Sequence, residues 1–166
     1  MKFLTIRDLT NNNLTQDKKI ILRVDFNVPI DNGVIMNDQR IVQSLPTIKH
    51  LLEYGDVKSI VILSHLGRPK GVYNKKFSLK PVHELLEKLL NKKINFIEDG
   101  CRYNNLFKIW NCEKGEIFLF DNIRFYMEET LKIDSNKHHI YNKSLIYLFR
   151  QRLNALGDIF INDAFG

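Results

Sequence analysis

Short apolar runs alternate with longer amphipathic segments along this chain, and this alternation constrains the fold more than any other feature. Runs rich in β-branched and aromatic residues predict buried strands at residues 19–24, 59–63, 95–97, 116–120 and 158–161. Most of these runs are separated by segments in which apolar residues have the spacing of an amphipathic helix. Strands that alternate with helices are typical of a parallel α/β sheet.

The first two predicted helices have recognisable ends. Asp38 can cap a helix that Gly55 terminates, and Pro46 predicts a kink or a restart inside it. Its apolar face consists of Ile41, Leu45, Ile48 and Leu52. Ser78 is the expected cap of the next helix.

The remaining segments complete the predicted fold. Residues 28–35 predict a small hairpin, residues 102–111 a helix, and the polar residues 127–142 a long surface loop. A last helix stops at Gly157, with one side made of Leu145, Leu148, Phe149, Arg152, Leu153 and Leu156. We therefore expect one domain over residues 1–166, with a Rossmann-like three-layer α/β/α fold and a mainly parallel sheet.

The composition is that of a globular protein. Hydrophobic residues make up 44% of the chain and charged residues 27%. No apolar run approaches the ~20 residues of a membrane span, and the start lacks the apolar stretch of a secretory signal. Cys101 and Cys112 have no partner at metal-ligand spacing, which argues against zinc and favours free thiols. We interpret the protein as cytoplasmic, with no membrane partner.

The net charge of +6 favours an anionic partner. The densest basic segment is the loop of residues 65–76, which contains no acidic residue and carries Arg68, Lys70, Lys75 and Lys76. Such a loop suits a small phosphorylated ligand as well as a nucleic-acid backbone. The chain has no long basic run and no aromatic-studded strand motif, which argues against nucleic acid.

Polar and charged residues follow four of the predicted strands, at the edge where ligands bind in open α/β sheets. These residues are Asp25 and Asn27, then Ser64, His65 and Arg68, then Asp121, Asn122 and Arg124, and finally Asn162 and Asp163. His65, Arg68 and Arg124 would form a cationic rim. Asp25 and Asn27 can accept hydrogen bonds from a hydroxyl group. The pattern predicts a site for a small anion that also carries a hydroxyl.

Taken one at a time, these residues have simpler structural interpretations. His65 can be a structural histidine, Arg68 a solvated charge and Asp25 a turn cap. Arg124 can lay its stem over Phe125 and pair with a nearby Glu. Only the shared edge of the sheet favours a ligand site over these alternatives.

Arg40 is a separate candidate. In the first turn of the helix that begins near Asp38, the helix dipole disfavours a cation by ~0.3–1 kcal/mol. Screening by Asp38 can offset this effect, and a bound anion over the helix start would explain it better.

Several standard phosphate and catalytic motifs are absent from the sequence. The eight glycines give no G-x-G-x-x-G, and there is no G-x-x-x-x-G-K-[ST], G-x-S-x-G or H-E-x-x-H. A P-loop is therefore excluded, and the dinucleotide fingerprint is missing.

At the same strand ends the sequence resembles the phosphoglycerate kinase family, from near residue 17 to the last residue. The matching stretches are residues 23–29 (Arg-Val-Asp-Phe-Asn-Val-Pro), Arg40-Ile41, residues 64–71 (Ser-His-Leu-Gly-Arg-Pro-Lys-Gly), residues 122–125 (Asn-Ile-Arg-Phe) and residues 158–166 (Asp-Ile-Phe-Ile-Asn-Asp-Ala-Phe-Gly). Asp121 departs from the family, which usually has Glu there.

The resemblance implies an N-terminal domain that binds 3-phosphoglycerate or 1,3-bisphosphoglycerate. In that family Mg²⁺ with ADP or ATP is bound by the C-terminal domain, so no cofactor or metal is expected within these 166 residues. The parent enzyme would be a cytoplasmic, glycolytic monomer. On the family's pattern the domain is incomplete at its C-terminal end, and these residues alone are expected not to turn over. The alternative is a non-catalytic α/β module that binds small anions.

The resemblance also implies roles for single residues. Asp25 and Asn27 would contact the hydroxyl and the carboxyl end of the substrate. Arg40 would reach the carboxyl or acyl-phosphate end and stabilise the transferring group, which makes it the catalytic candidate. The non-transferred phosphate would be held by His65, Arg68 and Arg124.

Overall fold

Parallel strands form the centre of the protein in the computed structural model, which describes residues 4–99, 103–130 and 140–164. The sheet order is β5 (Asn95–Ile97), β6 (Glu116–Phe120), β4 (Ser59–Leu63), β1 (Lys19–Val24) and β7 (Ile159–Asp163). Each neighbouring pair is parallel, and Ile20 of β1 lies opposite Ile60 and Ile159. A separate antiparallel pair, β2 (Ile30–Asp31) and β3 (Val34–Ile35), confirms the predicted hairpin.

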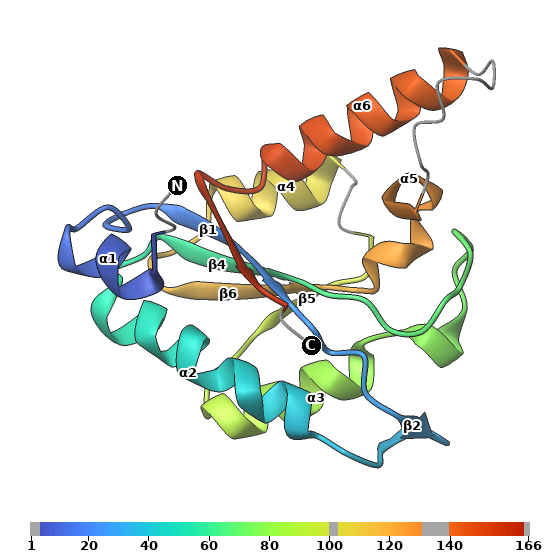
Figure 1. Ribbon diagram of the computed structural model, residues 1–166, viewed down its shortest axis with the longest axis horizontal. Coiled ribbons are helices and arrows are strands. Elements are labelled where there is room, and N and C mark those ends of the chain that lie inside the picture. Colours follow the sequence, from blue (N-terminus) through green and yellow to red (C-terminus); the bar gives the residue numbers. More distant parts are fainter. Residues whose placement is uncertain (1–3, 100–102, 131–139, 165–166) are drawn as a thin grey trace.

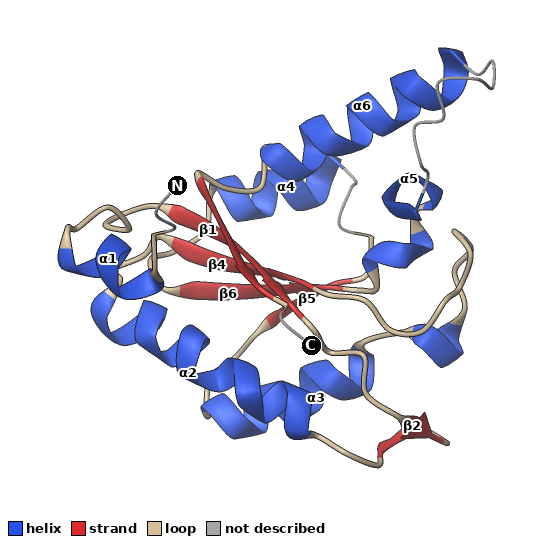
Figure 2. Ribbon diagram, in the orientation of Figure 1, coloured by secondary structure: helices blue, strands red, loops and turns tan. Residues whose placement is uncertain are grey.

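Helices cover both faces of this sheet, which confirms the three-layer α/β/α prediction (Figures 1 and 2). One face carries α1 (Ile6–Asn11), α2 (Gln39–Tyr54) and α3 (Lys80–Leu90). The other face carries α4 (Tyr103–Trp110) and α6 (Ile140–Asn154). Two buried clusters fill the spaces between these layers.

The side chains of β1 divide between the two clusters because successive residues of a strand point to opposite faces. Ile20, Leu22 and Val24 pack in the cluster under α2 and α3, whereas Ile21 packs in the cluster under α4. Arg23 therefore belongs to the same face as Ile21, although it lies within an otherwise apolar strand.

Helix α2 begins and ends where the sequence predicts, with Asp38 before its first residue and Gly55 after its last. Asp38 occupies the predicted N-cap position, although its side chain forms no capping hydrogen bond. The helix also continues through Pro46 without a restart, because its buried face of Ile41, Leu45, Ile48 and Leu51 packs continuously on the sheet.

The starts of α1 and α3 differ from the sequence-based expectation. Thr5 and Asp8 form a capping box that begins α1, a helix that the apolar pattern did not reveal. Helix α3 is capped by Leu79, not by Ser78. The Ser78 hydroxyl accepts a hydrogen bond from the Lys80 N–H at 3.2 Å and donates to the buried carboxylate of Asp121 at 2.9 Å. Ser78 thus lies one residue before the N-cap position, and its hydroxyl joins the first N–H of α3 to a tertiary contact.

The segment predicted as a long loop contains helical structure. Residues 127–130 form the single-turn helix α5 (Met127–Thr130), α6 already begins at Ile140, and residues 131–139 lie outside the described part of the chain. The predicted apolar side of α6 is also partly wrong, because Leu148 and Arg152 are exposed and Ile146 is buried. Ile146, Phe149, Leu153 and Leu156 form the inner stripe of α6, in which Leu153 and Leu156 pack in the cluster on the sheet and Phe149 contacts the Tyr126 ring.

Candidate functional site

The loops that follow β1, β4 and β6 are joined by hydrogen bonds at one edge of the sheet. Ser64, which follows β4, is completely buried; its Oγ donates to the Val24 carbonyl at 2.9 Å and accepts from the Phe26 N–H at 2.8 Å. Its own carbonyl accepts from the N–H of Ile123, the first residue of η2 (Ile123–Phe125), at 3.1 Å. The predicted meeting of these strand ends is confirmed.

Gly67 fixes the loop after β4 between the other two loops. Its N–H donates to Asn27 Oδ1 at 2.8 Å, and its carbonyl accepts from Arg124 Nη1 at 3.0 Å. Its φ of +59° lies in the left-handed region, and a Cβ there would lie 2.6 Å from the Phe77 ring. Only glycine fits at this position. Its two backbone hydrogen bonds hold the side chains of Asn27 and Arg124 in place.

Asn122 and Asp121 are buried beneath these loops and form hydrogen bonds with their backbone. The buried Asn122 amide donates to the carbonyls of Leu66 (2.6 Å) and Phe77 (3.0 Å), and its Oδ1 accepts from the Arg124 N–H at 3.0 Å. Burial raises the pKa of the Asp121 carboxyl, which accepts hydrogen bonds from the Leu79 N–H, the Asn122 N–H and Ser78. Both side chains are buried, and their hydrogen bonds position the loops.

Asp25 connects the loop after β1 to the start of α2. Its Oδ2 pairs with Arg40 Nη1, and its Oδ1 accepts from the Asn27 N–H at 2.9 Å. The carboxylate of Asp25 thus compensates the unfavourable position of Arg40 in the first turn, so a bound anion is not needed to explain it. The Arg40 side chain keeps 44% of its surface exposed and remains accessible from solvent.

His65 lies beside Arg23, whose Nη2 is 3.3 Å from His65 Nδ1. Burial lowers the pKa of His65 to about 4, and the positive charges of Arg124 and Arg23 add to this effect. Asp25 acts in the opposite direction, and Arg40 lowers the pKa further. These influences show that His65 shares one electrostatic environment with four charged side chains. The imidazole is therefore neutral at pH 7.

Glu129 of α5 lies between Arg23 and Arg124, which are both half-buried. Its Oε1 is 3.7 Å from Arg23 Nη2, and its Oε2 is 3.6 Å from Arg124 Nε. Both distances are those of ion pairs that lack a hydrogen bond. Arg23 Nη1 and Arg124 Nε are buried and have no hydrogen-bond partner among the described residues.

The structure brings five of the six predicted site residues into one cluster: Asp25, Asn27, Arg40, His65 and Arg124. Arg68 follows Gly67 in the same loop, but it is exposed and pairs with no described residue. Asn162 and Asp163 belong to β7, where Asp163 lies opposite Val24 in the register. Burial raises the pKa of Asp163, although a hydrogen bond with the Thr47 side chain acts in the opposite direction.

Arg23 and Glu129 are members of the cluster that the sequence-based site did not include. An arginine inside the apolar run of residues 19–24 was a signal, because a buried charge requires a partner. The interpretation that Arg124 pairs with a nearby Glu is confirmed by Glu129, at 3.6 Å. No signal linked Glu129 to Arg23, which is far away in sequence.

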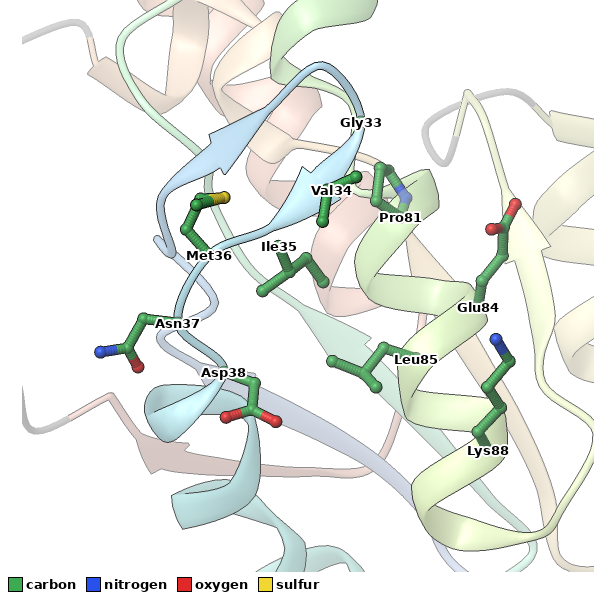
Figure 3. Close-up of a pocket in the computed structure, with 10 residues that line it drawn as sticks. All are labelled: Gly33, Val34, Ile35, Met36, Asn37, Asp38, Pro81, Glu84, Leu85 and Lys88. Carbon is green, nitrogen blue, oxygen red and sulfur yellow. The ribbon is translucent and has the colours of Figure 1, made fainter.

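A surface pocket lies away from this cluster, between the β2–β3 hairpin and α3 (Figure 3). Its volume is ≈ 510 Å³, and Ile35 and Leu85 lie on opposite sides of it. None of the six predicted site residues lines it.

Two further features concern metals and membranes. Among residues 4–99, 103–130 and 140–164, no group of three or more His, Cys, Asp or Glu side chains is arranged to hold a metal ion. No helix in that part of the chain is both long and apolar enough to cross a bilayer. Cys112 is buried and free, and Cys101 lies outside the described residues.

A parallel, three-layer sheet with a basic cluster at the carboxyl ends of its strands defines an α/β domain of the open-sheet class. Residues 8–166 match the family model described as phosphoglycerate kinase. This match begins somewhat earlier in the chain than the resemblance seen in the motifs, which starts near residue 17. The chain therefore belongs to the phosphoglycerate kinase family.

Individual relatives agree with this assignment. Phosphoglycerate kinases of Eremothecium gossypii and Funneliformis mosseae are 44% and 46% identical to the chain, over 98% of its length. Solved structures from Coxiella burnetii and Pyrococcus horikoshii superpose with TM-scores of 0.71 and 0.77, at 36% and 30% identity, and cover 99% and 98% of the chain. The chain spans 38% of the length of these two curated relatives, and 36% and 37% of the two solved chains.

Proposed function

We propose that this chain is the phosphoglycerate-binding part of a glycolytic kinase. The whole protein would transfer a phosphoryl group between 1,3-bisphosphoglycerate and ADP, giving 3-phosphoglycerate and ATP. The observation that carries the proposal is the gathering of Arg23, Arg40, His65 and Arg124 at one sheet edge, in a chain of this family.

The non-transferred phosphate is assigned to His65, Arg68 and Arg124. Arg124 supports this assignment because its Nε is buried without a hydrogen-bond acceptor among the described residues, and a phosphate oxygen is the acceptor that a guanidinium prefers. Arg68 supports it differently, since its exposed side chain has no described partner and is available to a ligand.

The other end of the substrate is assigned to Asp25, Asn27 and Arg40. Asn27 Oδ1 is already bonded to Gly67, so its side-chain amide is left to donate to a hydroxyl or carboxylate. Arg40 is the catalytic candidate, because phosphoryl transfer depends mainly on positioning and on neutralising charge. Its pairing with Asp25 holds the guanidinium near the loop where the substrate would lie.

Mg²⁺ and the nucleotide would supply the phosphoryl donor or acceptor. The described residues offer no metal cluster, and we assign that site to the portion of the relatives that this chain does not cover. The 166 residues tested alone are therefore expected to show no ATP-dependent turnover. We further propose a cytosolic monomer with no nucleic-acid or membrane partner.

A titration followed by NMR tests the assigned site. Addition of 3-phosphoglycerate should shift backbone amides near Asp25, in residues 64–71 and near Arg124, with weak affinity. D-glycerate, which lacks the phosphate, is the matched control and should bind more weakly. Shifts confined to the opposite edge of the sheet, or none at millimolar ligand, would contradict the proposal.

A further inference from the structure

Glu129 places a negative charge beside two arginines of the basic cluster but accepts no hydrogen bond from them. The carboxylate lies at ion-pair distance from both Arg23 and Arg124 and forms a hydrogen bond with neither. Its side chain is only 18% exposed, so its charge acts on the two arginines through poorly screened surroundings. The carboxylate thus has the position of a counter-ion and lacks the geometry of a bidentate structural salt bridge.

The two arginines retain donors that an additional acceptor could satisfy. Arg23 Nη1 and Arg124 Nε are both buried without a hydrogen-bond partner in the described part of the chain. Unmade hydrogen bonds at buried charged groups are unfavourable. A tetrahedral anion that replaced the Glu129 carboxylate would bring three oxygens to these donors.

The short helix that carries Glu129 is tied to the loop that carries the other ligand candidates. The Gly71 N–H donates to the Arg124 carbonyl at 3.2 Å, and a Cβ on Gly71 would lie 2.8 Å from the Met127 Cβ. Figure 1 shows α5 beside the loop that follows β4. A displacement of α5 would therefore also move the loop that contains His65 and Arg68.

We propose that Glu129 is an internal counter-ion that occupies the basic cluster until a phosphate group displaces it, and that it sets the affinity threshold for every anion that enters. This inference rests on the proposed function, because the displacing ligand is the phosphate group of the substrate. The carboxylate must leave the arginines before any anion reaches them. The free energy of breaking its ion pairs is then the same for each anion, whatever the rest of that ligand contacts.

The test compares Glu129→Gln with wild type and with Glu128→Gln in the 166-residue chain. Glutamine keeps the size of the side chain and removes its charge. Glu128 is the matched control, because it lies in the same helix and forms no ion pair with a described residue. Dissociation constants for inorganic phosphate and for 3-phosphoglycerate are measured by calorimetry or NMR at fixed ionic strength.

We expect Glu129→Gln to bind both ligands about tenfold more tightly, a change of ~1.4 kcal/mol, with the same factor for each. Glu128→Gln should change both affinities by less than about twofold. In the wild-type chain, phosphate alone should also shift the amides of residues 127–130. This measurement still decides the question if Glu129→Gln fails to fold.

Three outcomes would overturn the inference. If Glu129→Gln binds phosphate more weakly, Glu129 positions the arginines and does not compete with the ligand. If both glutamine variants tighten binding equally, only net charge matters. If phosphate leaves residues 127–130 unshifted while it binds, no displacement occurs. These results would leave the proposed function intact, whereas absence of any 3-phosphoglycerate binding in wild type and variants would overturn both.

Discussion

Arg40 of α2 and Asp25 after β1 form an ion pair that links the first turn of a helix to the end of the neighbouring strand. The same carboxylate accepts a hydrogen bond from the Asn27 N–H, so the pair also orders the loop that follows β1. Arg40 is held by one partner and is still 44% exposed. It is thus preorganised near the site and remains free to bind a second anion.

This arrangement predicts different kinetic effects for Arg40 and Arg68. If Arg40 meets charge that develops on the transferring group, Arg40→Ala should lower kcat by ~10²-fold or more in the catalytically competent full-length protein. Arg40→Lys should restore only part of the loss, because an ammonium keeps the charge without the planar fork. Steady-state kinetics with 3-phosphoglycerate and ATP measure both values.

Arg68→Ala should chiefly raise KM, because a phosphate that stays in place is held equally in the ground and transition states. A near-normal kcat for Arg40→Ala, or an Arg68→Ala variant that loses only kcat, would contradict this division of roles.

The stability of the protein should depend on the neutral form of His65. Its folded-state pKa of about 4 is below the ordinary value of 6.5, so the unfolded chain binds more protons between these pH values. The free energy of unfolding contributed by His65 is therefore fully present above pH ~6.5 and is lost as the pH falls toward 4. Urea denaturation at pH 5 and pH 7.5 should show a smaller pH effect in His65→Gln than in wild type.

An equal pH effect in the two proteins would show that His65 is not responsible. A bound phosphate should also raise the pKa of His65, because its negative charge favours the imidazolium. The ring signal that His65→Gln removes should then titrate at higher pH in the presence of 3-phosphoglycerate.

Gly71 is expected to tolerate no side chain. Gly71→Ala would place its Cβ 2.9 Å from the Met127 Cα, at a φ of +76°. Gly115 has a similar φ of +78°, and a Cβ at that position would have no atom within 4 Å, so Gly115→Ala serves as the control for backbone strain alone. Both variants should lose ~1–2 kcal/mol of stability from strain, and Gly71→Ala a further ~1–3 kcal/mol from overpacking.

Phosphate binding provides a second measurement for the Gly71→Ala and Gly115→Ala variants. Gly71→Ala should also weaken phosphate binding, because it moves the loop of residues 64–71 relative to α5. Equal denaturation midpoints and equal affinities for the two variants would contradict the close packing of Gly71 on Met127.

Asp121 should be more important for stability than the serine it binds. Asp121→Ala removes the acceptor for the buried N–H groups of Leu79 and Asn122, which should lower the free energy of unfolding by ~2–5 kcal/mol. Ser78→Ala removes the hydroxyl that donates to Asp121 and accepts from the Lys80 N–H, and should lower the free energy of unfolding by ~1 kcal/mol. Chemical denaturation measures both, and equal losses would show that the carboxylate is not the support described above.

The sequence alone was sufficient for the sheet and for most of the strand-end residues. Apolar runs such as residues 19–24 predict strands because their burial is decided by composition and length, and parallel pairing then brings their carboxyl ends to one edge. Asp25, Asn27, His65 and Arg124 could therefore be assigned to a common site before any contact was known. Local signals were weaker for helix starts, as at Ser78, which lies one residue before the cap position of α3 and also donates to the distant carboxylate of Asp121.

The tertiary structure decided how the charges at that edge are paired. Glu129 lies in a four-residue helix within a polar segment, and no periodic pattern marks so short an element. Its partner Arg23 is more than a hundred residues away in sequence, so their ion pair depends on how the loops pack. The strand periodicity determined where the site lies, because burial is a property of local sequence. The pairing of Arg23 with Glu129 was determined only by the folded arrangement, because electrostatic partners are selected by distance in space.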